Sequence, residues 1–490
     1  MEYGNGFKKS AFGELLTASP HCEIQIDAVY GLRLKTDITT FTDTGASGAL
    51  TLNTNSNGTK EFKVSSGTGS ATYCIMNSKR TVRYRPGQGI RFAFTGRFTT
   101  GVANNSQRIG AWNQGNEASF GYLGTAFGLF FRTGGLPAIY SLTVSAGAGG
   151  AENATVTLNG VAKVVAITAG SAAFNAAELA KETYTGWIVS SLGAVVTFVA
   201  QNDSTFAGAF TLTSTGTCAG TFATTYAGLT SSLTTAFVAN TSWNIDKCNG
   251  LGPSGFNIDP TKGNVFQIKM QYLGYGPITY SVENESGVLF PVHRTMYPNS
   301  NVTPTFSIPN FKTTIISVNT GNTTSISCYS SSMAGFIDGN PKFTRDLDSR
   351  SFSKANIGTT STPILSIRNK TVFNNTFNMT SLSLSSLSGA IDGAKPGTIE
   401  LILNAVLTGV VWTSHDATNS IVSYDTTATA LSIGSNSQIM HSFNLSKAGD
   451  FYAQFDSFEQ IFEAGDSITI AAKSSSTTID VTCSLDWQED

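Results

Sequence analysis

Apolar and polar residues alternate along most of this chain. Runs such as "EIQIDAVYGLRL", "GALTLNTNSNGTKEFKVSS" and "NVFQIKMQYLGYGPITYSVEN" are apolar at about every second position, and clusters of Gly, Asn and Ser separate them. Alternation with a period of two, bounded by such turn residues, is typical of β-strands joined by hairpins. Long helical patterns and heptads are missing from the sequence. The chain is therefore predicted to be mainly β.

The run "IRFAFTGRF" is the clearest of these strands. Phe92, Phe94 and Phe98 alternate with Arg91 and Arg97. Successive side chains of a strand point to opposite faces of the sheet. We therefore expect the three phenylalanines to be buried and the two arginines to stay accessible.

Residues 141–236 have a different composition, with only six charged residues. The dipeptide "NG" between Leu158 and Val161 is a strong signal for a tight hairpin. An Ala-rich segment from Ser171 to Thr183 predicts a helix, with Ser171 as its N-cap. We interpret this stretch as a small β-β-α-β-β module inserted into a surface loop, where added length costs little entropy.

A chain of 490 residues is expected to form two to four domains. The alternating pattern resumes after the inserted stretch, and the polarity and proline of residues 343–363 are typical of a linker. We predict an N-terminal arm (1–21), an interrupted β-sandwich (22–140 with 237–342), the inserted α+β module (141–236), the linker (343–363) and a C-terminal β-sandwich (364–490).

Composition points to a polar but nearly neutral surface. Charged residues make up 13% of the chain and the formal net charge is -2, while Ser, Thr and Asn are abundant. Such surfaces are typical of large β-rich assemblies. The first twenty residues lack the apolar core of a signal peptide. The longest apolar run, residues 401–412, is shorter than the ~20 residues that span a bilayer. We expect neither classical export nor insertion into a membrane.

Residue types that carry catalysis or bind metals are sparse and scattered. The four histidines lack metal-type spacing, and the six cysteines form no CxxC pair, so we expect free thiols. Nucleophile-elbow and dinucleotide motifs are incomplete. The sequence therefore predicts no enzyme, no cofactor and no bound metal.

Arginines are concentrated near the N-terminus. Residues 62–116 contain eight Lys or Arg and no acidic residue, whereas residues 446–490 contain nine Asp or Glu and two Lys. A strip of arginines and aromatic residues could bind single-stranded nucleic acid, form a solvated sheet face, or contact another subunit. Because RNP and KH motifs are absent, we favour the last interpretation and expect no nucleic-acid partner. The candidate contact residues are Arg83, Arg85, Arg91 and Arg97.

Several segments together resemble a group of virion structural proteins from tailed bacteriophages and large DNA viruses. They are "VRYRPGQG", "FTTGVANNSQRIGAWN", "FGYLGTAFGLFFRTGG", "VHRTMYPNSNVTPTF" and the closing "AGDSITIAAKSSSTTIDVTCSLDW". The inserted "VVAITAGSAAFNAAELA" resembles a small module that recurs in phage structural proteins. The resemblance covers most of the chain. It implies lectin-like or jelly-roll sandwiches and a virion component without enzymatic activity, made in the host cytoplasm.

Two functions remain open at this point. The first is a structural component of the capsid or tail surface that assembles with copies of itself and with other virion proteins. The second is a fibre or spike module for host attachment that binds carbohydrate on a host surface. Aromatic residues stack on sugars, so Trp112, Tyr122 and Trp243 are the candidate carbohydrate-binding residues.

Overall fold

The chain forms two compact units, each built from residues that are distant in the sequence. The first contains residues 1–136 and 229–342, and the second contains residues 137–228 and 343–490. The computed structural model describes residues 20–29, 31, 34, 38–43, 47–231, 236–339, 347–393, 395–434, 436–455 and 461–489. Residues 1–19 of the predicted N-terminal arm lie outside the described residues, and the first strand begins at His21.

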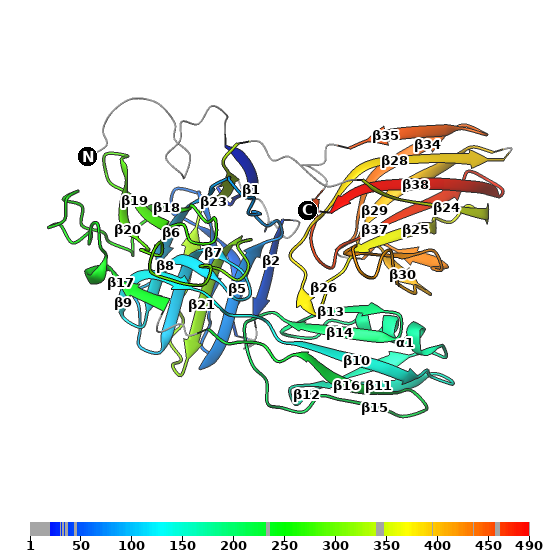
Figure 1. The fold of residues 1–490 in the computed structure, drawn as a ribbon, viewed down its shortest axis with the longest axis horizontal. Coiled ribbons are helices and arrows are strands. Elements are labelled where there is room, and N and C mark those ends of the chain that lie inside the picture. Colours follow the sequence, from blue (N-terminus) through cyan, green and yellow to red (C-terminus); the bar gives the residue numbers. More distant parts are fainter. Residues whose placement is uncertain are drawn as a thin grey trace. The chain divides into compact units, whose positions relative to one another are not determined.

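The first unit is a sandwich of two antiparallel sheets (Figure 1). In the larger, nine-stranded sheet the order is β20 (Leu289–Arg294), β19 (Ile278–Glu283), β18 (Asn264–Met270), β6 (Ile90–Phe98), β22 (Ser327–Ser330), β4 (Lys60–Ser65) and β3 (Ala49–Thr54), while β23 (Ser332–Ile337) joins β6 to β1 (His21–Asp27). In the seven-stranded sheet the order is β17 (Phe237–Ala239), β9 (Ala126–Arg132), β8 (Glu117–Leu123), β7 (Asn105–Trp112), β21 (Lys312–Thr320), β5 (Ala71–Ser78) and β2 (Thr39–Asp43), and the short 3-10 helix η1 (Asn240–Ser242) follows β17.

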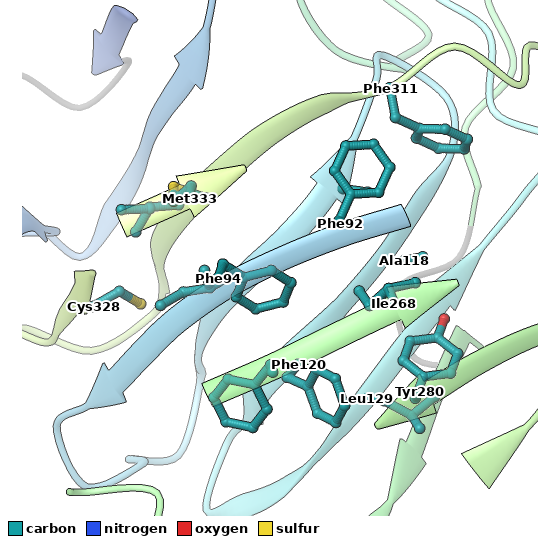
Figure 2. Close-up of a cluster of buried hydrophobic side chains, with 14 of the residues drawn as sticks. Phe92, Phe94, Ala118, Phe120, Leu129, Ile268, Tyr280, Phe311, Cys328 and Met333 are labelled. Atoms are coloured by element: carbon teal, nitrogen blue, oxygen red, sulfur yellow. The ribbon is translucent and has the colours of Figure 1, made fainter. Parts of the chain in front are cut away.

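Aromatic side chains from both sheets fill the space between them (Figure 2). Phe94 of β6 contacts Phe120 of β8 with ring centroids 6.5 Å apart, and Phe120 stacks on Phe266 of β18 at 4.5 Å. Along β6 buried and half-buried residues alternate without interruption. The prediction that Phe92, Phe94 and Phe98 are buried while the arginines of this strand reach the surface is confirmed.

The inserted residues leave and rejoin the first unit at one point. The backbone N–H of Leu136 donates to the carbonyl of Leu229, and the N–H of Leu229 donates back to Leu136, both at 2.9 Å. Beyond this pair, β17 continues the sheet by pairing with β9. The two ends of the insertion are therefore held side by side, and the sheet closes as though the connection were a short loop.

The inserted residues fold as two small sheets and one helix, α1 (Ala172–Ala180). The N-cap is Ser171, whose Oγ accepts from the N–H of Phe174 at 3.2 Å, so the predicted helix is confirmed. Asn159 and Gly160 both have positive φ, as the predicted two-residue hairpin requires. The described strands number seven and exceed the four expected: β13 (Trp187–Leu192), β14 (Val195–Ala200), β10 (Ile139–Ala146) and β16 (Ala219–Tyr226) in one sheet, β12 (Val161–Ile167), β11 (Glu152–Leu158) and β15 (Thr211–Ser214) in the other.

The C-terminal residues form a jelly roll. In the first sheet the order is β24 (Asp348–Ile357), β38 (Ile479–Glu489), β28 (Leu382–Asp392) and β35 (Asp450–Gln454), and β36 (Ile461–Phe462) pairs with β28. In the second sheet the order is β31 (Thr413–Ser414), β32 (Val422–Asp425), β25 (Thr362–Asn369), β37 (Ser467–Ser474), β29 (Gly397–Leu403) and β34 (Gln438–Leu445). Two small hairpins complete it: β26 (Val372–Phe373) with β27 (Thr376–Phe377), and β30 (Val406–Thr408) with β33 (Ala430–Ser432). Successive long strands alternate between the sheets, except for β29 and β34, which pair with each other, and this is the jelly-roll order. The mainly β fold and its sandwiches are thus confirmed.

Strand β24 occupies much of the segment that the sequence predicts to be a linker, residues 343–363. It pairs along most of its length with β38. Three of its four half-buried positions hold charged residues, so the sequence shows no clear alternation of apolar and polar residues. Arg350 lies 3.5 Å from the ring centroid of Tyr424, and the ammonium of Lys354 donates to the carbonyl of Pro363 at 2.7 Å. Charged residues on the inner side are a common feature of edge strands.

Within the second unit, the inserted module packs against the jelly roll. Arg368 of β25 is buried, donates to the carbonyl of Ser191, and lies 4.3 Å from the ring centroid of Trp412. Ala177 of α1 joins a hydrophobic cluster with jelly-roll residues such as Ile402. Burial lowers the pKa of the Arg368 guanidinium. This contact makes the module part of the second unit.

Helix α1 has nine residues. In the described part of the chain no helix combines the length and the apolar character needed to cross a bilayer.

We predict that Phe94→Ala lowers the free energy of unfolding by about 3–5 kcal/mol, because it empties space in a packed core. Val265→Ala, a change at an exposed position of the neighbouring strand β18, should change it by less than about 1 kcal/mol. Denaturant unfolding of both variants checks this. Equal effects would contradict the assignment of the two faces of the sheet.

A second prediction concerns Arg368. Arg368→Met fills a similar volume without a buried charge, so we expect a change in unfolding free energy of less than about 1.5 kcal/mol. Arg368→Ala leaves a cavity between the module and the jelly roll and should cost about 2–4 kcal/mol. Calorimetry would measure both. If Met were as damaging as Ala, the hydrogen bond to Ser191 would matter more than packing.

Candidate functional site

The four arginines expected at a subunit contact lie in different environments. Arg83 is only 4% exposed, so it offers no surface to a second copy, and the expectation for this residue is corrected. Arg85 is half-buried next to the turn that contains Gly87. Arg91 and Arg97 point from the outer face of β6. The structure thus brings together only the last two on one sheet face.

Arg97 has an acidic partner within its own chain. Its Nη2 lies 2.6 Å from Oε2 of Glu61 on β4, and its guanidinium stacks 3.8 Å from the ring centroid of Tyr329. Asn53 also donates to Glu61, at 3.3 Å. Glu61 immediately precedes the acid-free window of residues 62–116, so the sequence alone made Arg97 look unpaired.

Several of the C-terminal acids that were expected to meet the arginines are engaged inside the jelly roll. Glu489 accepts from the Ser420 hydroxyl at 2.6 Å, and Asp466 accepts from the Asn404 amide at 2.9 Å. Asp480 accepts from the backbone N–H of Asn356 at 2.8 Å. These carboxylates have structural roles. Contact between copies through the remaining arginines stays a prediction.

The aromatic residues expected to stack on sugars lie in the interior. Trp243 contacts Phe120 edge to face, and its indole N–H donates to the carbonyl of Val238 at 3.3 Å. Tyr122 packs against Phe98, and burial raises the pKa of its hydroxyl. Trp112 belongs to a small buried cluster on the other face of its sheet. Because all three side chains are buried, none of them can stack on a sugar at the surface. Their assignment to a carbohydrate-binding site is therefore corrected.

A buried ion cluster on β7, β8 and β9 escaped the sequence analysis. Glu117 is 0% exposed; its Oε2 lies 2.5 Å from Nη1 of Arg108 and 3.5 Å from Nε of Arg132. The hydroxyl of Ser119 donates to its other oxygen at 2.6 Å. Burial, with a further contribution from Glu117, raises the pKa of Tyr280. The buried charges of the cluster are paired with one another, which indicates a structural role.

A pocket with a cavity volume of about 280 Å³ opens in the first unit, at one end of the β18–β19 pair. Its apolar lining consists of Phe256, which packs edge to face on Phe290, and Val265 at the start of β18. Two loops close it: residues 256–264 before β18 and the turn after β19. The pocket therefore sits on loops supported by paired strands.

Hydrogen bonds fix both loops of the pocket. Asp259 accepts from the N–H and hydroxyl of Thr261, at 3.0 and 2.6 Å, and these bonds lower the pKa of its carboxyl. The Asn264 amide donates to the carbonyl of Asp259 at 2.9 Å. In the turn after β19, the side-chain oxygen of Asn284 accepts from the N–H of Val288 at 2.9 Å. The cavity is thus preformed.

Amides and carboxylates line the rest of this pocket. Asn257, Glu283 and Glu285 have no side-chain hydrogen bond to another described residue, while Lys262 pairs with Asp259 at 3.6 Å. Among the described residues, no group of three His, Cys, Asp or Glu is arranged to hold a metal ion. The pocket offers acceptors and donors in a small space beside an apolar wall, which suits a neutral ligand with many hydroxyl groups.

The described cysteines are all free thiols. Cys22 is exposed, and the other five are buried. Burial raises the pKa of the Cys328 and Cys483 thiols to about 12, which keeps them protonated and unreactive.

Comparisons with known proteins give distant structural neighbours only. No family model matches the chain, and no curated protein matches it. The chain is similar to the binding domain of botulinum neurotoxin serotype C1 (TM-score 0.25, 8% identity, 92% of this chain and 94% of that one). It is also similar to the serotype D/C binding domain (0.26, 8%, 71% and 58%) and to a lectin from Bauhinia forficata in complex with GalNAc (0.22, 9%, 66% and 100%). The chain thus spans less than two thirds of the serotype D/C domain. TM-scores this low carry no argument, so the fold assignment rests on strand order.

A matched pair of substitutions tests the role of the buried ion cluster. Glu117→Gln removes the buried counter-charge of Arg108 and should cost about 3–5 kcal/mol of unfolding free energy. Glu61→Gln removes the partner of Arg97, whose side chain is 30% exposed and therefore partly solvated, and should cost about 1 kcal/mol or less. Urea unfolding compares them. A cost for Glu117→Gln no larger than that for Glu61→Gln would disprove the structural role.

Proposed function

We propose that this protein is a non-enzymatic carbohydrate-binding module whose ligand occupies the pocket at the Val265–Glu283 end of the β18–β19 pair. The observation that carries the proposal is the preformed cavity, which combines an apolar wall with amide and carboxylate groups. Sugars present both kinds of surface, since their C–H faces are apolar and their edges carry hydroxyls.

The chemistry of the lining supports this ligand class. Carboxylates such as Glu283 accept hydrogen bonds from hydroxyls, and the amide of Asn257 both donates and accepts. Phe256 is held by Phe290 and supplies the apolar wall. Because the loops are already ordered by their own hydrogen bonds, binding does not require the loops to become ordered.

A virus particle is the setting that we propose for this binding activity. The segments that resemble virion structural proteins support it, as does the jelly-roll order of the C-terminal sandwich. Jelly rolls occur in both viral capsid and lectin domains, so the fold alone does not choose between assembly and attachment. The partners would then be copies of the chain, other virion proteins and a host-surface glycan. Mass spectrometry of purified particles tests this setting, and absence of the chain from them would overturn it.

A glycan array followed by calorimetry tests the carbohydrate proposal. We expect the wild-type chain to bind a defined set of glycans, and Asn257→Ala combined with Glu283→Ala to weaken that binding at least about tenfold, the loss of two hydrogen bonds. Glu182→Ala, at an exposed carboxylate of the inserted module, is the matched control and should bind as the wild type does. If no glycan binds, or if the pocket variant binds normally, the proposal is wrong.

A further inference from the structure

Three cationic side chains form a row across the outer face of the nine-stranded sheet. Arg91 of β6 pairs in register with Lys269 of β18, Lys269 with Thr279 of β19, and Thr279 with Arg294 of β20. These strands lie next to one another in the sheet (Figure 1). Register partners on antiparallel strands share a face, so all three cations project to the same side. We call Arg91, Lys269 and Arg294 the cationic row.

Few negative charges offset the three cations of the row. Arg91 and Lys269 are directly opposite each other on strands about 5 Å apart, an arrangement that is destabilising for like charges. None of the three forms an ion pair with a carboxylate in the described part of the chain; Arg97, on the same strand, does so with Glu61. Partial burial and the charge of Arg91 both lower the pKa of Lys269, and Asp338 is the acid that raises it.

Neighbouring side chains fix the positions of the two arginines of the row. The guanidinium of Arg91 lies 4.5 Å from the ring centroid of Phe336, its register partner on β23. The Nε of Arg294 donates to the hydroxyl of Thr279 at 3.3 Å, which orients its guanidinium. Lys269 remains accessible despite its partial burial, Arg294 is exposed, and Arg91 is half-buried. Positioned cations that lack carboxylate partners are the chemistry that recognises an anion.

The cationic row and the pocket share the two strands β18 and β19. Val265 and Glu283 line the pocket at one end, and Lys269 and Thr279 belong to the row at the other. Both sets lie on the outer face, since Phe266 and Ile268 of β18 point into the core. Four residues along a strand separate Val265 from Lys269 by roughly 13 Å. Between them lies Gln267, whose register partners are Ser281 on β19 and Ala93 on β6, and both Gln267 and Ser281 are buried.

We propose that the ligand is an acidic oligosaccharide, with a neutral sugar in the pocket and a carboxylate or sulfate group on Arg91, Lys269 and Arg294. This inference rests on the proposed function and names its substrate class. The pocket end of the face carries three carboxylates and one ammonium, those of Asp259, Glu283, Glu285 and Lys262, and the row end carries three cations. The opposite charges of the two ends fix the direction of the ligand, with its acid group away from the pocket.

The experiment compares three versions of one oligosaccharide backbone: neutral, carboxylated and sulfated. Calorimetry with the full chain should give at least about tenfold tighter binding of one or both acidic versions at physiological salt. The preference should shrink as salt rises, because the row is exposed. Lys269→Gln combined with Arg91→Gln should abolish the preference while leaving the neutral version bound as before. Lys269→Arg should keep the preference, and Lys60→Gln, at a lysine on β4, should have no effect.

The outcomes separate this inference from the proposed function. Equal affinity for the neutral and acidic versions, with binding still lost in the pocket variant, overturns the acidic ligand and leaves carbohydrate binding intact. Loss of all saccharide binding in the wild type overturns both. A single-stranded DNA of equal charge that competes as well as the saccharide would show a general polyanion surface and would also overturn the inference. Matching unfolding midpoints of the double variant and the wild type confirm that the variant is folded.

Discussion

The alternation of side chains along β6 is the constraint on which the first unit depends. This strand pairs with β18, β22 and β23, so it holds together the two halves of the nine-stranded sheet. Its phenylalanines fill the space between the sheets, and its arginines are fixed on the outer face by the same geometry. A shift of one residue would exchange the two sets, which would expose the aromatic core and bury the charges. Core packing and surface charge therefore have one common cause.

Local patterns were sufficient to predict the elements that depend on neighbours in sequence. Phe92 and Phe94 alternate with polar residues, Ser171 caps α1, and Asn159 with Gly160 makes the hairpin turn. Strand β24 was missed because three of its four half-buried positions hold charged side chains, whose partners lie outside the strand.

The candidate site could not be predicted in this way. Its pocket joins residues before β18 to residues after β19, and only the pairing of these strands brings them together. The same limit applies to Trp243 and Trp112, because a short stretch of sequence does not show whether other parts of the fold bury a side chain. The Glu117 cluster likewise depends on the register of three strands.

The backbone pairing of Leu136 with Leu229, at the two ends of the insertion, has a consequence for the order in which parts of the chain can fold during synthesis. The ribosome must make all of residues 137–228 before β17, β18 and the later strands of the first unit exist, a delay of about ten seconds at ~5–20 residues per second. The inserted module can fold during this delay, but Arg368 and Trp412 emerge much later. The surface of α1 that contacts the jelly roll therefore stays exposed until the jelly-roll residues have been made. A nascent chain stalled in this interval would present that surface to chaperones.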